Sequence, residues 1–184
     1  MSKIGKKPIK IPEGVLVEIK DSTIQVKGKN STNSVNILHG IKPEIKDGFI
    51  TLAPIGDSKQ VLSNWGTMGA LITNAVHGAK EDFIKELSVV GVGYRASVEG
   101  EKLVLNIGFS HPVKFQIPKG IKVKVEKNII QVIGPDKSLV GEITAKIRKI
   151  KKPEPYQGRG IRYKNEVVRK KQGKKAAAAT GAAK

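Results

Sequence analysis

The chain of 184 residues has no cysteine and few aromatic residues: one tryptophan, three tyrosines and four phenylalanines. Without cysteine, disulfides, thiolate catalysis and cysteine-ligated zinc sites are excluded. No apolar run approaches the roughly 20 residues that a membrane-spanning helix needs. The first eight residues, Met-Ser-Lys-Ile-Gly-Lys-Lys-Pro, lack the hydrophobic core of a signal peptide. We therefore expect a soluble cytoplasmic protein without membrane association.

Patterns that mark catalysis or a bound cofactor are also missing. The sequence has no nucleophile-elbow motif, no Walker loop and no pair of carboxylates in an apolar context. Its three histidines, His39, His77 and His111, are isolated from one another. Residues 91–96 (Gly-Val-Gly-Tyr-Arg-Ala) fit the dinucleotide fingerprint, but a strand-like alternation follows them instead of a helix. We predict no enzymatic activity, metal site, cofactor or small-molecule substrate.

What the chain has in excess is positive charge. Lys and Arg number 34 against 16 Asp and Glu, a net charge of +18, which indicates a polyanionic partner such as nucleic acid. Residues 151–184 contain 11 Lys and Arg but only 2 acids, so they carry half of the surplus. All five arginines follow residue 94. The contact surface should therefore lie in the C-terminal half of the chain.

An internal repeat relates residues 11–28 to residues 117–134, where 8 of 18 positions are identical at an offset of 106. In both copies Val or Ile alternates with polar residues, which predicts a hairpin of two half-buried strands. An apolar stripe at helical spacing follows each copy, from Asp57 to Gly78 and from Asp136 to Pro153. Chance similarity of two hairpins is the alternative. The pattern predicts an α+β fold: a tandem duplication of two similar domains, each an antiparallel β-sheet with one helix packed on a face.

The expected organisation has four parts. Residues 1–82 form the N-terminal α+β domain, and residues 83–152 form the C-terminal one, with inserted strands at 87–92, 94–98 and 103–107. Residues 153–175 form a basic RNA-binding extension. Residues 176–184 are an alanine-rich tail that has nothing to bury and should be disordered. Trp65 lies on the apolar face of the first helix and is expected in the core.

The basic extension carries the strongest candidate site. Residues 153–163 read Pro-Glu-Pro-Tyr-Gln-Gly-Arg-Gly-Ile-Arg-Tyr, directly after two lysines. Arginine offers a planar fork that matches phosphate oxygens, and tyrosine offers a face that stacks on bases. The alternating glycines suggest an extended backbone that presents these side chains; a solvated linker is the alternative. The predicted RNA-binding residues are Tyr94, Arg95, Arg148, Lys151, Lys152, Tyr156, Gly158, Arg159, Gly160, Arg162, Tyr163, Lys164, Arg169, Lys170 and Lys171.

Two of the assignments outside the extension have open alternatives. Tyr94 and Arg95 form either a loop tip that faces RNA or an ordinary glycine-rich turn between strands. His111, in the turn at 109–112 (Phe-Ser-His-Pro), either donates a hydrogen bond to RNA or has a structural role.

Several of these stretches together resemble the bacterial-type large-subunit ribosomal protein L6 family. The resemblance covers residues 1 to about 175 and rests on segment 153–163, with support from 2–9, 91–96, 109–112 and the duplication itself. Gln157 stands where the family commonly has a lysine, so one cation of the motif is lost, whereas Arg159 keeps the charge of its position.

The resemblance implies two duplicated α+β domains and a structural, non-enzymatic role in the large ribosomal subunit. It also implies binding to 23S ribosomal RNA near the sarcin–ricin loop, in the region where translational GTPases dock. Neighbouring large-subunit proteins are further expected partners. The charge and motifs alone leave open an alternative, a free-standing RNA-binding module or RNA chaperone.

Overall fold

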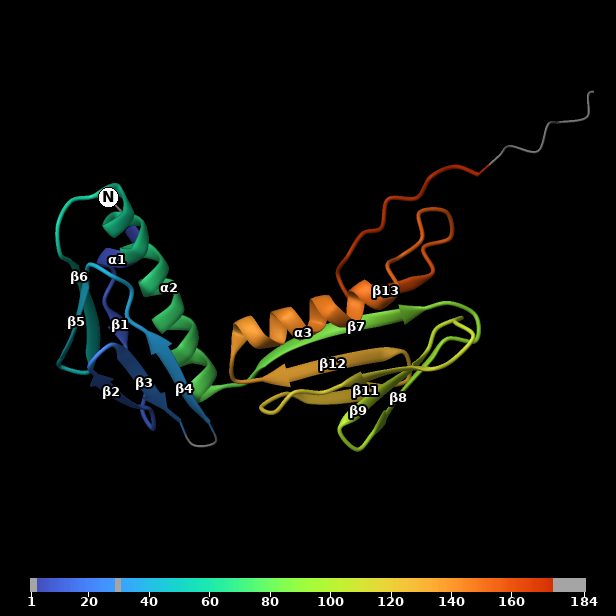
Figure 1. The fold of residues 1–184 in the computed structure, drawn as a ribbon, viewed down its shortest axis with the longest axis horizontal. Helices are drawn as coiled ribbons and strands as arrows, with labels where there is room; N and C mark the ends of the chain where they lie inside the picture. The colour runs from blue at the N-terminus through green and yellow to red at the C-terminus, as the bar shows by residue number, and fades with distance from the viewer. Residues whose placement is uncertain (1–2, 29–30, 174–184) are drawn as a thin grey trace, which may run out of the picture. The chain divides into compact units, whose positions relative to one another are not determined.

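The computed structural model describes residues 3–28 and 31–173, so the predicted alanine-rich tail at 176–184 lies outside the described residues (Figure 1). The described residues fall into two compact units. The first unit comprises those up to Lys85 together with Pro118–Lys122 and Val132–Ile143. The second unit comprises Glu86–Ile117, Val123–Gln131 and the described residues from Thr144 onward. The four-part domain organisation stays a prediction.

The N-terminal part of the chain forms two three-stranded antiparallel sheets, with strand orders β2-β3-β4 and β1-β6-β5. The long helix α2 lies along these strands (Figure 1). The elements are α1 (Lys3–Lys6), β1 (Ile9–Lys10), β2 (Leu16–Lys20), β3 (Thr23–Lys27), β4 (Thr32–Asn36), β5 (Ile41–Lys46), β6 (Phe49–Pro54) and α2 (Lys59–Lys80).

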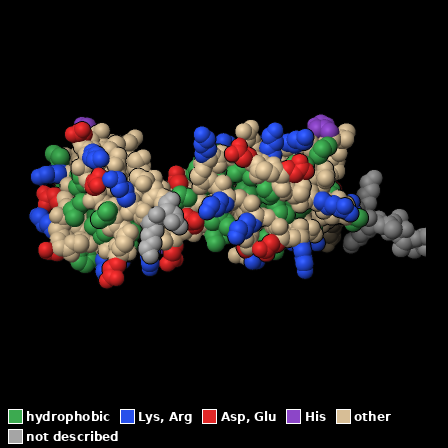
Figure 2. All heavy atoms as spheres, turned by 90° about the horizontal axis from the view of Figure 1, so that it is seen from below, with side chains coloured by type: hydrophobic (Ala, Val, Ile, Leu, Met, Phe, Trp, Pro, Cys, Tyr) green, Lys and Arg blue, Asp and Glu red, His purple; other side chains and the backbone are tan. Residues whose placement is uncertain are grey.

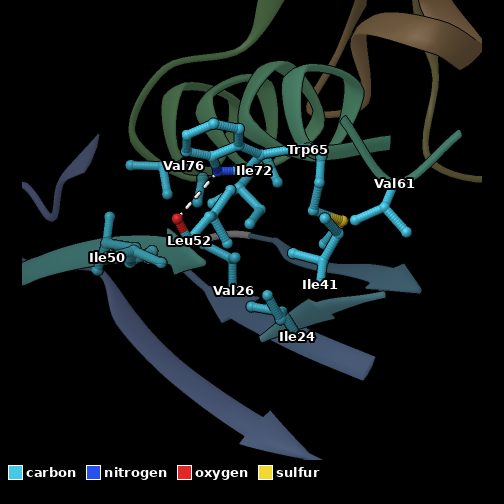
Figure 3. Packing of buried hydrophobic residues seen from close by; sticks show 13 residues of the cluster. Ile24, Val26, Ile41, Ile50, Leu52, Val61, Trp65, Ile72 and Val76 are labelled. Carbon is cyan, nitrogen blue, oxygen red and sulfur yellow. Dashed lines mark hydrogen bonds between the residues drawn. The ribbon is translucent and has the colours of Figure 1, made fainter. Parts of the chain in front are cut away.

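The core of this part forms where the apolar stripe of α2 meets the strands (Figure 3). Met68 and Ile72 of the helix and Ile24 and Val26 of β3 are completely buried. The prediction for Trp65 is confirmed: the ring is buried, and its Nε1 donates a hydrogen bond to the Leu52 carbonyl at 2.9 Å. This bond satisfies the one polar atom of the buried indole.

Both ends of α2 differ from the prediction. The N-cap is Ser58 and not Asp57, because the Ser58 hydroxyl accepts a hydrogen bond from the Val61 N–H at 3.2 Å. The helix does not end at Gly78 but continues to Lys80. Gly78 lacks the positive φ of a helix-ending glycine, and the Glu81 N–H still donates to the His77 carbonyl.

The C-terminal part forms a four-stranded sheet of order β11-β12-β7-β13, a three-stranded sheet of order β10-β9-β8, and helix α3, which lies along the four-stranded sheet (Figure 1). The predicted inserted strands are present as β7, β8 and β9 with shifted bounds. The elements are β7 (Phe83–Val90), β8 (Arg95–Glu99), β9 (Lys102–Asn106), β10 (Val113–Gln116), β11 (Lys122–Glu126), β12 (Ile129–Gly134), α3 (Lys137–Ile150) and β13 (Gly160–Tyr163).

The duplication extends to the backbone conformation. Strands β2 and β11 lie at the repeat offset, and so do the starts of β3 and β12. The turn residues Asp21 and Lys127, also at that offset, both have positive φ, 42° and 54°. Gly14 and Gly120 have φ values of 84° and 85°. The predicted α+β fold with a repeated hairpin is confirmed.

Candidate nucleic-acid interface

Part of the basic extension is a strand of the folded sheet. β13 pairs antiparallel with β7, with Ile161 opposite Val89 and Tyr163 opposite Leu87. Ile161 is completely buried and ties the strand to the core. The sequence pattern does not predict this strand, because four residues that contain one glycine and one arginine carry little strand signal. The pairing anchors to the sheet both the segment that precedes β13 and the segment that follows it.

The segment between α3 and β13 is a closed loop, so the prediction of an extended backbone is wrong up to residue 159 and holds only where β13 begins. The Ile161 N–H donates to the Lys151 carbonyl at 2.8 Å, and the Glu154 N–H donates to the Arg159 carbonyl at 2.9 Å. Within the loop the Gly158 N–H reaches the Glu154 carbonyl at 3.0 Å. We name residues 151–161 the closed loop. Its backbone hydrogen bonds hold the exposed side chains on a fixed frame.

The two glycines of the closed loop have structural roles. Gly158 has a φ of 73° and Gly160 a φ of 143°, values that side-chain-bearing residues rarely adopt. A Cβ atom on Gly160 would lie 2.7 Å from the Lys152 carbonyl oxygen and 2.8 Å from the Pro153 Cα. Gly160 therefore permits the close approach of the chain to its own backbone, which is a reason for the glycine independent of RNA.

Arg148 forms an ion pair within the protein. Its Nε donates to Glu166 Oε2 at 2.9 Å, and its Nη2 pairs with Glu166 Oε1. The same guanidinium lies 5.6 Å above the Tyr163 ring, and Glu166 also accepts from the Tyr163 N–H at 3.0 Å. The hydrogen bond from Arg148 holds the pKa of Glu166 below its ordinary value, and Glu166 in turn raises the pKa of Arg148. We name Arg148, Tyr163 and Glu166 the tail clamp.

Lys164 is also paired. Its ammonium group lies against Glu86 Oε2, and Glu86 Oε1 accepts a hydrogen bond from Gln131 at 3.0 Å. The Lys164 N–H donates to the Glu86 carbonyl as well. The pKa of Glu86 is lowered, chiefly by the hydrogen bond from Lys164 and then by that from Gln131. The sequence did not indicate the roles of Glu86 and Glu166. Glu166 stands out only as an acid within a basic segment, and Glu86 becomes recognisable only once the fold places it opposite that segment.

One further loop contacts the closed loop, and a second loop packs against the first. The Lys151 Nζ lies 4.6 Å above the ring of Phe109, in the loop between β9 and β10. Tyr94 lies over two glycines, because a Cβ on Gly91 would come within 2.5 Å of its ring and one on Gly108 within 3.2 Å. Phe109 was missed as a contact of the site. The packing gives Tyr94 a structural role, while its neighbour Arg95 is exposed at the start of β8.

The remaining predicted residues form an exposed set. Tyr156 is 53% exposed, and the Lys171 N–H donates to the Pro155 carbonyl at 2.8 Å, which brings the following basic segment against the closed loop. Within the described residues, the side chains of this set form no ion pair. We name these residues the open set. It consists of one tyrosine and six cations: Tyr156, Arg95, Lys152, Arg159, Arg169, Lys170 and Lys171. The face seen from below in Figure 2 carries Lys and Arg together with several Asp and Glu side chains around a hydrophobic area of the C-terminal part.

Arg162 belongs neither to the cations in ion pairs nor to the open set. Its side chain is half-buried, and its Nε is fully buried with no hydrogen-bond partner in the described part of the chain. Along β13 it alternates with Ile161 and Tyr163, so it lies on the other face of the sheet. An unpaired buried donor of this kind gains from any acceptor that reaches it.

No group of three or more His, Asp or Glu side chains that could hold a metal ion occurs within residues 3–28 and 31–173. No helix in this part of the chain is both long and apolar enough to cross a membrane.

Comparison with known proteins gives one consistent result. The family model described as ribosomal protein L6 matches residues 11–82 and 90–164. A relative from Nitratiruptor sp., named large ribosomal subunit protein uL6, is 46% identical over 176 residues, which cover 96% of this chain and 99% of the relative. Proteins of the same name from Aliarcobacter butzleri and Paracoccus denitrificans are each 45% identical, over 95% of this chain and 98% and 99% of their own lengths.

Proposed function

The chain belongs to the ribosomal protein L6 family, and from that premise we propose that it binds 23S ribosomal RNA of the large subunit through the closed loop and the open set. Its role is structural and it is not an enzyme. Its site of action is the cytoplasmic ribosome, beside other ribosomal proteins. The observation that carries the proposal is the concentration of unpaired cations and an exposed tyrosine on a hydrogen-bonded loop.

The paired and unpaired cations have different roles in this proposal. Arg148 and Lys164 are neutralised by Glu166 and Glu86, so they position the segment. Lys152, Arg159 and Lys170 are exposed without an intramolecular acid, so they are available to phosphates. Each phosphate contact releases a counterion, which makes the affinity depend on salt.

Preorganisation explains why a folded loop suits this task. A flexible basic linker would lose conformational entropy on binding. The closed loop is already fixed by its backbone hydrogen bonds, which lowers that cost. Tyr156, more than half exposed, supplies a ring on which an unpaired base can stack.

The proposal also includes the position of the chain on the large subunit. The resemblance of segment 153–163 to the family signature supports a position near the sarcin–ricin loop, where translational GTPases dock. A free-standing RNA-binding module is the rival function, and sedimentation separates the two. A structural component stays with the large subunit through a moderate salt wash, whereas a free module is released.

The salt dependence of RNA binding tests the role of the open set. We expect the logarithm of the association constant for 23S RNA to fall with log salt, with a slope of roughly −4 to −5 if each of the six open-set cations contacts one phosphate. Replacing Arg159 and Lys170 by Ala should reduce the steepness by about 1.4 to 1.8. Lys42→Ala with Lys59→Ala, in the first unit, is the matched control. An unchanged slope in the Arg159 and Lys170 variant would contradict the proposal.

A further inference from the structure

The first unit has an apolar groove that the proposed function does not use. It runs between the N-terminal segment, residues 4–13, and the C-terminal half of α2. Ile4, which is 62% exposed, lines it together with Ile9, Ile11 and Val76. An isoleucine exposed to this degree next to further apolar side chains is typical of a surface that a partner covers.

The walls of the groove are fixed by packing within the first unit. A Cβ on Gly5 would lie 2.6 Å from the Trp65 ring, so α1 rests directly on α2. On the other side, β1 pairs with β6 through Ile9 and Ile50, and the Ile11 N–H donates to the Gly48 carbonyl at 2.9 Å. The groove is therefore preformed and would bind a partner at little ordering cost.

The charges at the rim are mostly positive. Lys7 and Lys10 line the groove from the N-terminal segment, and Lys80 lines it from α2. Lys7 and Lys10 have no ion pair among the described residues, whereas Lys80 lies 3.5 Å from Glu81 in an exposed pair. Glu13 is the acid on the rim. An apolar floor with a basic rim is complementary to a segment that combines apolar side chains with carboxylates.

RNA fits this groove less well than protein. Among the described residues that line it there is no Phe, Tyr or Trp to stack on a base, and its one histidine ring, His77, is already stacked on Phe83 with ring centroids 5.0 Å apart. Phosphates also do not bury isoleucine side chains. We propose that the groove receives a peptide segment of a neighbouring ribosomal protein, one that places Asp or Glu beside apolar residues. This inference rests on the proposed function only in assuming that the partner lies in the same subunit.

Cross-linking in assembled large subunits tests the inference. Because the chain has no cysteine, the full-length variant Thr73→Cys carries a single thiol in the groove for a photoactivatable cross-linker. We expect a cross-link to one protein segment that contains acidic and apolar residues. Adding Lys7→Glu and Lys10→Glu should reduce its yield at least fivefold, while Lys59→Glu, outside the groove, should leave it unchanged. Cross-linking to RNA alone, or no cross-linked product from assembled subunits, would overturn the inference.

A measurement on the free protein separates this inference from the proposed function. The full chain is titrated with a synthetic peptide that alternates glutamate and leucine. We expect saturable binding that weakens at least tenfold in the Lys7→Glu, Lys10→Glu variant and not in Lys59→Glu. If the peptide does not bind, or binds all three proteins equally, the groove is not an acidic-peptide site, whatever the chain does with RNA. If the peptide binds as expected but the chain does not sediment with large subunits, the proposed function fails alone.

Discussion

The Arg148 guanidinium of α3 pairs through two nitrogens with the Glu166 carboxylate, which lies just beyond β13. The pair joins the last turn of a helix to a segment that composition alone would mark as a free basic tail. Both side chains are largely shielded, at 27% and 23% exposure. A two-pronged pair with this shielding holds its geometry better than an exposed pair of flexible chains.

Removing the Glu166 charge should destabilise the second unit. Glu166→Gln leaves the Arg148 guanidinium partly buried without its counter-charge, at a cost of about 1–3 kcal/mol in the free energy of unfolding. Urea unfolding followed by circular dichroism measures this loss. Fluorescence of Trp65 reports on the first unit and should not change. Glu154→Gln, at an exposed position of the closed loop, is the control and should be nearly neutral.

The ion pairs of Glu166 and Glu86 predict an acid-sensitive stability. The pKa of Glu166 is lowered by Arg148, and that of Glu86 is lowered by Lys164. Because the folded-state pKa lies below the unfolded one, the contribution is complete above the ordinary value near 4.5 and is lost as the pH falls through the folded pKa. Unfolding measured from pH 7 down to about pH 3 should show this decline. Glu166→Gln should make it shallower; an identical decline in the variant would contradict the assignment.

The two glycines of the closed loop should differ in their tolerance of alanine. Gly160→Ala places a Cβ against the backbone of residues 152 and 153 and also strains φ, so we expect a loss of about 2–4 kcal/mol. Gly158→Ala has the strained φ, but its nearest neighbour is the end of Lys170 at 3.7 Å, so we expect only about 1 kcal/mol. Thermal unfolding of both variants tests this order, and equal losses would show that the close approach is unimportant.

Tyr156 and Gln157 should change RNA binding in different ways. Tyr156→Leu removes a stacking face but no charge, so affinity should fall by about 1–3 kcal/mol with an unchanged salt slope. Gln157→Lys adds a cation to the closed loop and should steepen the slope by about 0.7 to 0.9. Filter binding to 23S RNA at several salt concentrations measures both quantities. A slope change in the tyrosine variant, or none in the lysine variant, would argue against the assigned contacts.

The sequence predicted the features that depend on local pattern. The repeated hairpin followed from alternation of Val and Ile, and the burial of Trp65 from helical spacing. The features it missed depend on contacts between distant residues. β13 is a strand because it pairs with β7, about 70 residues earlier in the chain. Likewise, a single glutamate among lysines does not reveal that Glu166 neutralises Arg148, so free and paired cations look alike in the sequence.

Directed cleavage of RNA from the closed loop shows whether this loop is the RNA-binding surface. The variant Gln157→Cys, with its single thiol carrying an iron chelate, is assembled into large subunits, and Gln60→Cys in the first unit serves as the matched control. We expect strong cleavage of 23S RNA from position 157, with cuts that include the neighbourhood of the sarcin–ricin loop, and a weaker, different pattern from position 60. Weak or absent cleavage from position 157 in assembled subunits would contradict the assignment of this loop as the RNA-binding surface.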